Sequence, residues 1–358
     1  MKKLIFALAA STAMALAGQP ALAQDPTKVC AIYVGPIGDF GWSYQHHQGF
    51  LEMQEAIGKD KVELAYLESV PEGADGERAI ERFARSGCDI VFTTSFGYMD
   101  PTNKVAAKFP DVKFEHATGY KRETPNIATY NSKFHEGRYV QGVIAAKLSK
   151  AGVAGYIGSF PIPEVVMGIN AFVLGAQSVN PDFKVKVVWV NTWFDPGKEA
   201  DAAKALIDQG VDIVTQHTDS TAPMQVATER GIKAFGQASD MIAFGKETQL
   251  TSIVDDWGPY YTERVKAVID GTWAQQDVWG GMKEGHVVMA PYANMPDDVK
   301  KLAAETEAKI KSGEFNPFTG PIKKQDGSDW LKAGETADDK TILSMNFYVA
   351  GVDDKLPK

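Results

Sequence analysis

Residues 38–49 are Gly38-Asp39-Phe40-Gly41-Trp42-Ser43-Tyr44-Gln45-His46-His47-Gln48-Gly49. An apolar run precedes them and an amphipathic pattern follows, so the stretch lies where a buried parallel strand turns into a helix. Open α/β folds bind ligands at the carboxyl ends of their strands. The stretch supplies a carboxylate, glycines that allow close approach to the backbone, and an aromatic plane. These are the parts of a site for a flat, polar molecule.

Short apolar runs alternate with helical patterns through the rest of the chain, as in parallel sheets covered by helices on both faces. The alternation restarts near residue 136, which predicts two similar α/β lobes with a cleft between their strand ends. The expected strands are 29–35, 62–67, 89–94, 112–117, 127–130, 153–157, 185–190, 213–216, 232–235, 250–254 and 287–290. The expected helices are 42–57, 74–85, 101–109, 136–148, 163–179, 197–209, 222–230, 260–269 and 297–312.

The amino terminus has the pattern of a secretory signal peptide, residues 1–23. Lys2 and Lys3 precede an apolar stretch, and Ala21-Leu22-Ala23 supplies the small residues of a cleavage site. The apolar stretch is shorter than the roughly 20 residues that a membrane span needs. With no cysteine near the cleavage site for a lipid anchor, we expect a periplasmic protein that is not inserted in the membrane.

Length and charge restrict the class of protein. A chain of 358 residues exceeds what one core usually organises, which also favours two lobes. The formal net charge of −9 argues against a nucleic-acid or anionic-membrane partner. Cys30 and Cys88 are compatible either with a disulfide or with two buried thiols. No His or Cys has metal-ligand spacing, so we expect no metal and no cofactor.

Asp39 and Trp42 are the first candidate ligand-binding residues. Asp39 is suited to accept a hydrogen bond from a ligand amine, and the alternative is that it caps the following helix. Trp42 is suited to stack on a ring, and the alternative is packing on the helix face. For His46 and His47, packing on the helix face is the preferred interpretation, because no nucleophile or carboxylate lies at a spacing that would indicate a catalytic site.

Four further stretches follow predicted strands, at 93–100, 191–195, 216–221 and 237–240. They carry hydroxyl, aromatic, amide and carboxylate groups, and the alternative interpretation is ordinary capped turns. The candidate ligand-binding residues are Asp39, Trp42, Ser43, Phe96, Asp100, Asn131, Trp193, Phe194, Thr218, Asp219, Asp240 and Trp257.

Enzyme motifs are absent from the sequence. There is no G-x-S-x-G elbow, no P-loop, no dinucleotide glycine fingerprint after the first strand and no H-E-x-x-H. A glycosidase carboxylate pair stays open, although no pair is singled out. We therefore expect a binding protein rather than an enzyme.

A set of ordered motifs resembles one family over nearly the whole chain after residue 23. The motifs are Gly38-Asp39-Phe40-Gly41-Trp42, Cys88-Asp89-Ile90-Val91-Phe92-Thr93-Thr94, Phe109-Pro110-Asp111-Val112-Lys113-Phe114, Phe134-His135-Glu136-Gly137-Arg138-Tyr139-Val140-Gln141-Gly142, Gly152-Val153-Ala154-Gly155-Tyr156-Ile157-Gly158, Val179-Asn180-Pro181 and Asp195-Pro196-Gly197-Lys198-Glu199. Together they resemble the basic membrane protein family of ABC-transporter substrate-binding proteins, which includes the purine nucleoside receptor.

The resemblance implies a type I periplasmic binding protein fold, in which two doubly wound parallel-sheet lobes are joined by three crossovers. It implies lobe 1 at 24–132 plus about 245–275, and lobe 2 at 133–244 plus about 276–358. It also implies a purine held in the cleft, a permease partner in the inner membrane and a monomeric state.

The family motif places a carboxylate and an aromatic ring at Asp39 and Trp42, with Ser43 replacing an asparagine. By the same resemblance Asp100 and Phe194 face the ligand, with Phe194 opposite Trp42.

Nucleoside-binding members of the family tend to have an aspartate and a lysine that hold the ribose hydroxyls. In this sequence those two positions fall on Ala238 and Asp255, so the acceptor and the cation for the ribose are both absent. The resemblance therefore favours a free nucleobase such as adenine. The alternatives are a purine nucleoside, a periplasmic nucleoside hydrolase, or a protein that docks on a receptor's sensor domain.

Overall fold

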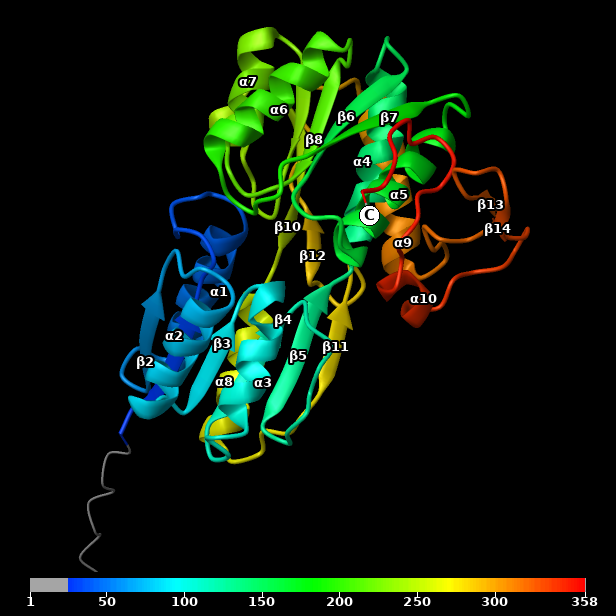
Figure 1. Cartoon of the computed structure of the whole chain (residues 1–358). Helices are drawn as coiled ribbons and strands as arrows, with labels where there is room; N and C mark the ends of the chain where they lie inside the picture. Colours follow the sequence, from blue (N-terminus) through cyan, green and yellow to red (C-terminus); the bar gives the residue numbers. More distant parts are fainter. Residues whose placement is uncertain (1–24, 358) are drawn as a thin grey trace, which may run out of the picture.

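The computed structural model describes residues 25–357, in which the strands form two six-stranded sheets and one two-stranded sheet. The predicted signal peptide lies outside the described residues. Each large sheet is the centre of one lobe, and the two lobes lie end to end in Figure 1. None of the helices in residues 25–357 is both long and apolar enough to cross a bilayer.

The sheet of the first lobe is entirely parallel and has the order β11-β5-β4-β3-β1-β2. Its strands are β1 (Thr27–Ile32), β2 (Val62–Leu67), β3 (Ile90–Thr93), β4 (Lys113–Ala117), β5 (Ile127–Ser132) and β11 (Asp277–Gly280). Helices cover both faces: α1 (Trp42–Ile57) and α8 (Gly258–Ile269) pack together, as do α2 (Ala74–Arg85) and α3 (Met99–Ala106).

The sheet of the second lobe has the order β12-β10-β9-β8-β6-β7, with only β12 antiparallel. Its strands are β6 (Val153–Gly158), β7 (Lys184–Trp189), β8 (Ile213–His217), β9 (Lys233–Gly236), β10 (Gln249–Asp255) and β12 (Val287–Met289). Its helices are α4 (Phe134–Leu148), α5 (Pro163–Gln177), α6 (Pro196–Asp208), α7 (Ala222–Arg230) and α9 (Asp297–Ser312).

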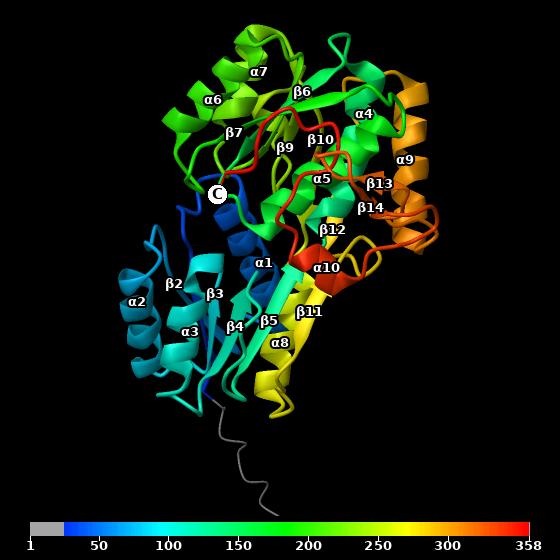
Figure 2. The same cartoon turned by 45° about the vertical axis from the view of Figure 1, so that its right-hand side comes forward.

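A carboxyl-terminal segment follows α9. It holds the hairpin β13 (Ile322–Lys323) and β14 (Asp329–Leu331), and the short helix α10 (Asp339–Leu343). Both views place α10 where the two lobes meet, close to α5 and to the carboxyl ends of β5 and β11 (Figures 1 and 2). The short 3-10 turns η1 (Phe96–Tyr98) and η2 (Ile242–Phe244) lie in loops at strand ends.

The predicted type I architecture is confirmed. The helices at 42–57, 74–85, 222–230 and 297–312 and the strand at 62–67 have the expected bounds. Three other segments, β11, β13–β14 and α10, were not predicted. They are short and carry little periodicity, so their partners in space decide their structure.

In residues 25–357 the chain crosses between the lobes three times: before α4, between β10 and α8, and between β11 and β12. The crossing points correct the expected lobe boundaries in two places. The strand β10, expected in lobe 1, pairs with β9 and β12 of the second sheet, and β11, expected in lobe 2, pairs with β5. Hydrogen-bond partners assign a strand to a sheet, and hydrophobic periodicity does not reveal them.

Aromatic residues fill the core of the first lobe. Trp257 is fully buried at the start of α8 and stacks on His46 of α1, with ring centroids 5.0 Å apart. His47 is also buried and hydrogen-bonds with the Tyr33 hydroxyl at 3.2 Å. Both histidines therefore pack on the helix face, as the sequence predicted.

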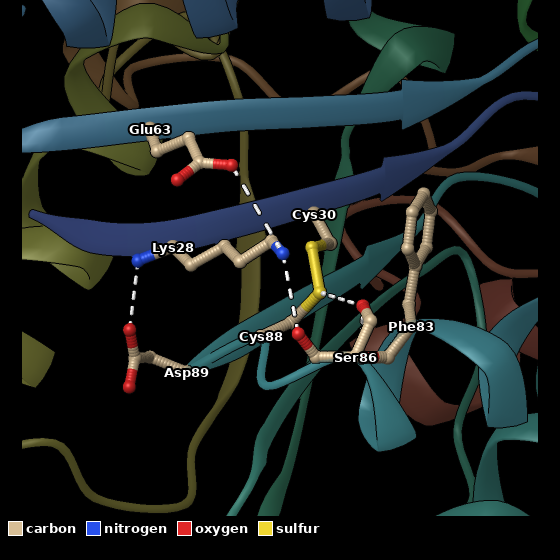
Figure 3. Close-up of a disulfide and its surroundings, with 7 residues drawn as sticks. All are labelled: Lys28, Cys30, Glu63, Phe83, Ser86, Cys88 and Asp89. Carbon is tan, nitrogen blue, oxygen red and sulfur yellow. Dashed lines mark hydrogen bonds and ion pairs between the residues drawn. A yellow bond between two sulfur atoms is a disulfide. The ribbon is translucent and has the colours of Figure 1, made fainter.

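The two cysteines are joined, which decides between the alternatives left open by the sequence. Figure 3 shows the disulfide between Cys30 of β1 and Cys88, which lies just before β3. Next to it, the Lys28 backbone N–H donates to the Asp89 carboxylate at 2.7 Å, and the Lys28 ammonium donates to the Ser86 carbonyl at 3.2 Å. The bridge connects neighbouring strands across 58 positions of sequence.

We expect the Cys30→Ala/Cys88→Ala double variant to lose about 2–4 kcal/mol of unfolding free energy, because the open loop gains conformational entropy in the unfolded chain. Urea unfolding followed by circular dichroism measures the loss. Wild-type protein treated with a reductant serves as the control and should approach the stability of the variant. Equal stability of oxidised wild type and variant would contradict the expectation.

Candidate functional site

The carboxyl ends of the two sheets face each other across a narrow cavity of about 20 Å³. Its walls come from both lobes, from residues that follow the ends of β1, β3, β4, β6, β7, β8 and β9. The lining residues are Val34, Trp42, Ser95, Phe96, Thr118, Glu164, Trp193, His217, Asp219 and Gln237. The position is the one where open α/β folds hold ligands.

Aromatic rings line the cavity from opposite lobes. Trp42 begins α1 in the first lobe, and its indole Nε1–H donates to the Thr94 carbonyl at 2.6 Å, which fixes the ring. Phe96 follows β3, and Trp193 follows β7 in the second lobe, where its ring packs against Phe160 with centroids 5.1 Å apart. The cavity therefore offers apolar planes from both sides to a flat ligand.

Asp219 brings an unsatisfied acceptor to this cavity. It is buried, and its Oδ2 has no hydrogen-bond partner within the described residues. Burial raises the pKa of Asp219 well above its ordinary value, and the nearby carboxylates of Asp39, Glu199 and Glu164 raise it further. A buried acceptor without a donor is costly, so a ligand N–H that reaches it would gain more than it would in water.

Glu164 and His217 form a second polar pair in the cavity wall. Glu164 Oε1 lies 3.5 Å from His217 Nε2, and both side chains are largely buried. Burial lowers the pKa of His217, although the neighbouring Glu164 opposes that shift. The pair presents a carboxylate and an imidazole ring to the cavity.

Gln237 is oriented by a buried arginine. Arg138 of α4 is fully buried and donates to the side-chain oxygens of Gln141 (2.9 Å) and Thr215 (2.8 Å), and also to the side-chain amide oxygen Oε1 of Gln237. Since Arg138 engages that oxygen, Gln237 has its NH₂ group to present to the cavity. The site thus combines carboxylate acceptors with an amide donor.

Asp39 caps helix α1. Its Oδ1 accepts the backbone N–H groups of Gly41 (2.8 Å) and Tyr44 (2.9 Å), and its Oδ2 accepts that of Ser43 (3.1 Å). Burial raises the pKa of Asp39 to about 6, and these backbone donors oppose the shift. Asp39 therefore has the contacts of a helix cap, and both of its carboxylate oxygens accept hydrogen bonds from backbone N–H groups.

The start of α1 also touches the second lobe directly. The Ser239 hydroxyl donates to the Phe40 carbonyl, and the Gln45 amide donates to the Asp255 carbonyl at 2.8 Å. The rings of Phe40 and Phe244 meet edge to face at 4.8 Å. These contacts hold the lobes together beside the cavity, so the structure is a closed form.

Several loops around the cleft adopt left-handed backbone conformations without glycine. Phe40 (φ 59°), Thr118 (φ 64°), Asn191 (φ 52°) and Ala238 (φ 60°) each follow a strand. The conformation costs energy, most of all for the β-branched Thr118. Such strained loops cluster where a fold positions functional groups.

The structure brings Trp42, Phe96, Trp193 and Asp219 of the predicted residues into the cavity wall. Ser43 and Thr218 are buried next to them in sequence, and the Ser43 hydroxyl accepts the Gly35 backbone N–H at 3.1 Å.

Besides Asp39, Ser43 and Thr218, five predicted residues lie outside the cavity wall. Asp100 is exposed and paired with Lys121, and the exposed Asp240 accepts from the Gln249 amide at 2.7 Å. Trp257 lies in the core, and Asn131 lines a neighbouring cavity. Phe194, expected opposite Trp42, lines a different pocket near Gly35, and its neighbour Trp193 lines the cavity instead. Adjacent residues after a strand point to different sides, and sequence alone did not decide between them.

Sequence reasoning missed Glu164, His217, Gln237 and Thr118 as cavity residues. His217 and Gln237 belong to strand-end stretches that were singled out, so position was a usable signal for them. Glu164 lies in the first turn of α5, after the loop that follows β6, which is also a strand-end position. No group of His, Cys, Asp and Glu in residues 25–357 has an arrangement that could hold a metal ion.

Residues 26–317 match the Bmp family, described as ABC transporter substrate-binding protein PnrA-like. The chain belongs to this family. The resemblance inferred from the motifs is thereby confirmed. A member of this family delivers a small-molecule ligand to a membrane permease.

Two relatives and one solved structure extend the comparison. The chain is 72% identical to a purine-binding protein of Brucella abortus, over 98% of this chain and 99% of that protein. It is 37% identical to a putative ABC transporter glucose-binding protein of Haloferax volcanii, over 91% of this chain and 80% of that protein. An ABC transporter solute-binding protein of Aeropyrum pernix shares the fold, with a TM-score of 0.71 and 21% identity over 88% and 95% of the two chains.

We expect Asp219→Asn to stabilise the ligand-free protein increasingly as pH rises. A raised pKa means that the folded state keeps a proton that the unfolded state loses, so the stability of wild type falls as pH rises above the ordinary value of 3.8. The variant lacks this fall. Its melting temperature should exceed that of wild type more at about pH 8 than at about pH 5.

Asp201→Asn, at an exposed carboxylate on α6, is the matched control and should show no such trend. A difference between Asp219→Asn and wild type that stays constant with pH would contradict the assignment of a proton to buried Asp219.

Proposed function

We propose that this protein captures a free purine base, adenine or a close analogue, between its lobes and delivers it to an ABC permease. The observation that carries the proposal is the combination of Trp42 and Trp193 on opposite lobes with the unpaired Asp219 oxygen in the same narrow cavity. A purine has two large π faces and a rim of donors and acceptors, which this combination complements.

Stacking supplies the first part of the recognition. Each aromatic–base stack contributes about 1–3 kcal/mol in nucleic-acid complexes. The cavity of about 20 Å³ has room for about one water molecule, so a base enters when the lobes rotate apart at the hinge. The lobes then close until the rings of Trp42 and Trp193 contact its two faces.

Hydrogen bonds to the rim supply selectivity. Asp219 and Glu164 are acceptors for the ring and exocyclic N–H groups of the base, and the Gln237 NH₂ group is a donor for a ring nitrogen. These groups replace the Asp39 and Asp100 carboxylates that the sequence suggested, because Asp39 is engaged by backbone and Asp100 is on the surface. A ligand that leaves them unpaired is penalised.

The narrow cavity supports a base over a nucleoside. A planar base requires the walls to separate by one ring thickness, roughly 3.5 Å. A nucleoside adds a ribose outside the base plane, whose hydroxyl groups need partners of their own. Ala238 and Asp255 are fully buried and lie outside the cavity wall. These are the two positions at which the sequence suggested that ribose-binding groups are missing. The proposal therefore rests on the cavity.

The remaining parts of the proposal follow from the family. The protein would act as a monomer in the periplasm after removal of residues 1–23, and it would bind without turnover. The 72% identical purine-binding relative supports the ligand class, while the 37% identical relative, which is named for glucose, makes that sugar the matched competitor to test.

Isothermal titration of refolded protein with adenine, guanine, adenosine, inosine and glucose tests the ligand. Refolding removes any ligand carried through purification. We expect saturable binding of adenine and binding of adenosine weaker by about tenfold or more. Binding of glucose with none of any purine would overturn the purine assignment. Nucleoside binding without base binding would overturn the refinement, and release of base from adenosine would make the protein a hydrolase.

Replacing Trp42 tests the stacking partner. We expect Trp42→Ala to weaken adenine binding by about 10- to 100-fold, in line with the loss of one aromatic stack. Trp330→Ala, in the β14 hairpin away from the cavity, is the matched control and should bind adenine like wild type. Equal loss in both variants, or no loss in Trp42→Ala, would remove Trp42 from the site.

A further inference from the structure

A second and larger cavity, of about 580 Å³, lies next to the first at the junction of the lobes. It is lined by residues of β5 and β11, by the loop after β4, by the start of α5, and by α10 and the residue after it. Phe96, Thr118 and Glu164 line both cavities, so they form the partition between them.

Glu164 faces both cavities. Its Oε1 lies 3.5 Å from His217 Nε2 in the wall of the first cavity, and its Oε2 lies 3.5 Å from Asn131 Nδ2 in the wall of the second. Beside it the Thr118 hydroxyl is buried and has no hydrogen-bond partner within the described residues. The partition therefore includes two polar side chains, Thr118 and Glu164, that a ligand group can engage from either cavity.

The rest of the second cavity is predominantly apolar. Ile162, Pro163 and Met167 line it from α5 and the residue before it, and Val278 and Trp279 from β11. A further part of the wall comes from Leu343 at the end of α10 and from Ser344 after it. An ion pair between Lys133 and Asp339, at 3.2 Å, ties α10 to the start of α4. This wall lies beyond residue 317, where the match to the family ends.

We propose that the second cavity binds an apolar substituent on the exocyclic amine of a purine, so that the protein takes 6-alkylamino- and 6-arylaminopurines as well as the free base. The inference rests on the proposed function. With the base in the first cavity, its amine donates to Glu164 at the partition. A secondary amine keeps one N–H for this bond, and its carbon substituent points across the partition to the apolar walls.

The test compares three ligands by isothermal titration: adenine, N6-benzyladenine and N6,N6-dimethyladenine. The benzyl compound has one N–H and a bulky apolar group, and the dimethyl compound has no amine N–H. We expect the benzyl compound to bind within about tenfold of adenine, and the dimethyl compound to bind more weakly than adenine by about tenfold or more.

Two variants then fill the second cavity without touching the first. Leu343→Trp and Ser344→Trp are expected to weaken binding of the benzyl compound by about tenfold or more and to change adenine binding by less than about twofold. Leu51→Trp on α1 is the matched control, since Leu51 is 38% exposed, Leu343 is 43% exposed, and Leu51 lines neither cavity.

The outcomes separate the two claims. If adenine binds and the benzyl compound binds more than about 100-fold more weakly than adenine, the proposed role of the second cavity is overturned. The proposed function then still stands. Unchanged binding of the benzyl compound in both tryptophan variants overturns the role of the second cavity as well. If wild type binds neither adenine nor any other purine, the proposed function fails and the substituent site fails with it.

Discussion

The close approach of Gly41 to Asp219 is the contact on which the closed arrangement depends. A Cβ on Gly41 would lie 2.3 Å from the Asp219 carbonyl oxygen, so only glycine lets the start of α1 reach the second lobe. This approach buries Asp39 and Asp219 in the same region, where neither carboxylate is well solvated. Closure therefore places two poorly solvated carboxyl groups beside the cavity, and a ligand that donates N–H groups to them relieves the cost.

The hinge explains how such a site opens. Three chain crossings join lobes that have separate sheets and cores, so the lobes can rotate with little change inside either. The interlobe contacts at Phe40, Gln45 and Ser239 are few and lie at one end of α1. They can break without loss of core packing. In contrast, the cavity-lining rings and carboxylates are held by their own lobes, so lobe motion would bring them together or apart.

The carboxyl-terminal segment adds a wall that neither sheet provides. The short helix α10 packs on α5 and pairs with α4 through Lys133 and Asp339. It encloses space beside the first cavity and brings Leu343 and Ser344 toward β11. Because the segment is attached to the second lobe and faces the first, its position relative to β5 and β11 changes when the lobes move.

The sequence alone determined the two α/β lobes, the helices at 42–57 and 74–85 and the strand-end position of the site, because periodicity and turns are local properties of the chain. It also singled out Trp42, Phe96, Trp193 and Asp219, which the structure places in the wall of the first cavity. Tertiary structure decided which sheet took β10 and β11, that Cys30 and Cys88 are joined, that Asp39 caps α1, and that Trp193 rather than Phe194 lines the cavity. Those outcomes depend on partners distant in sequence and on the direction of individual side chains, which no local pattern specifies.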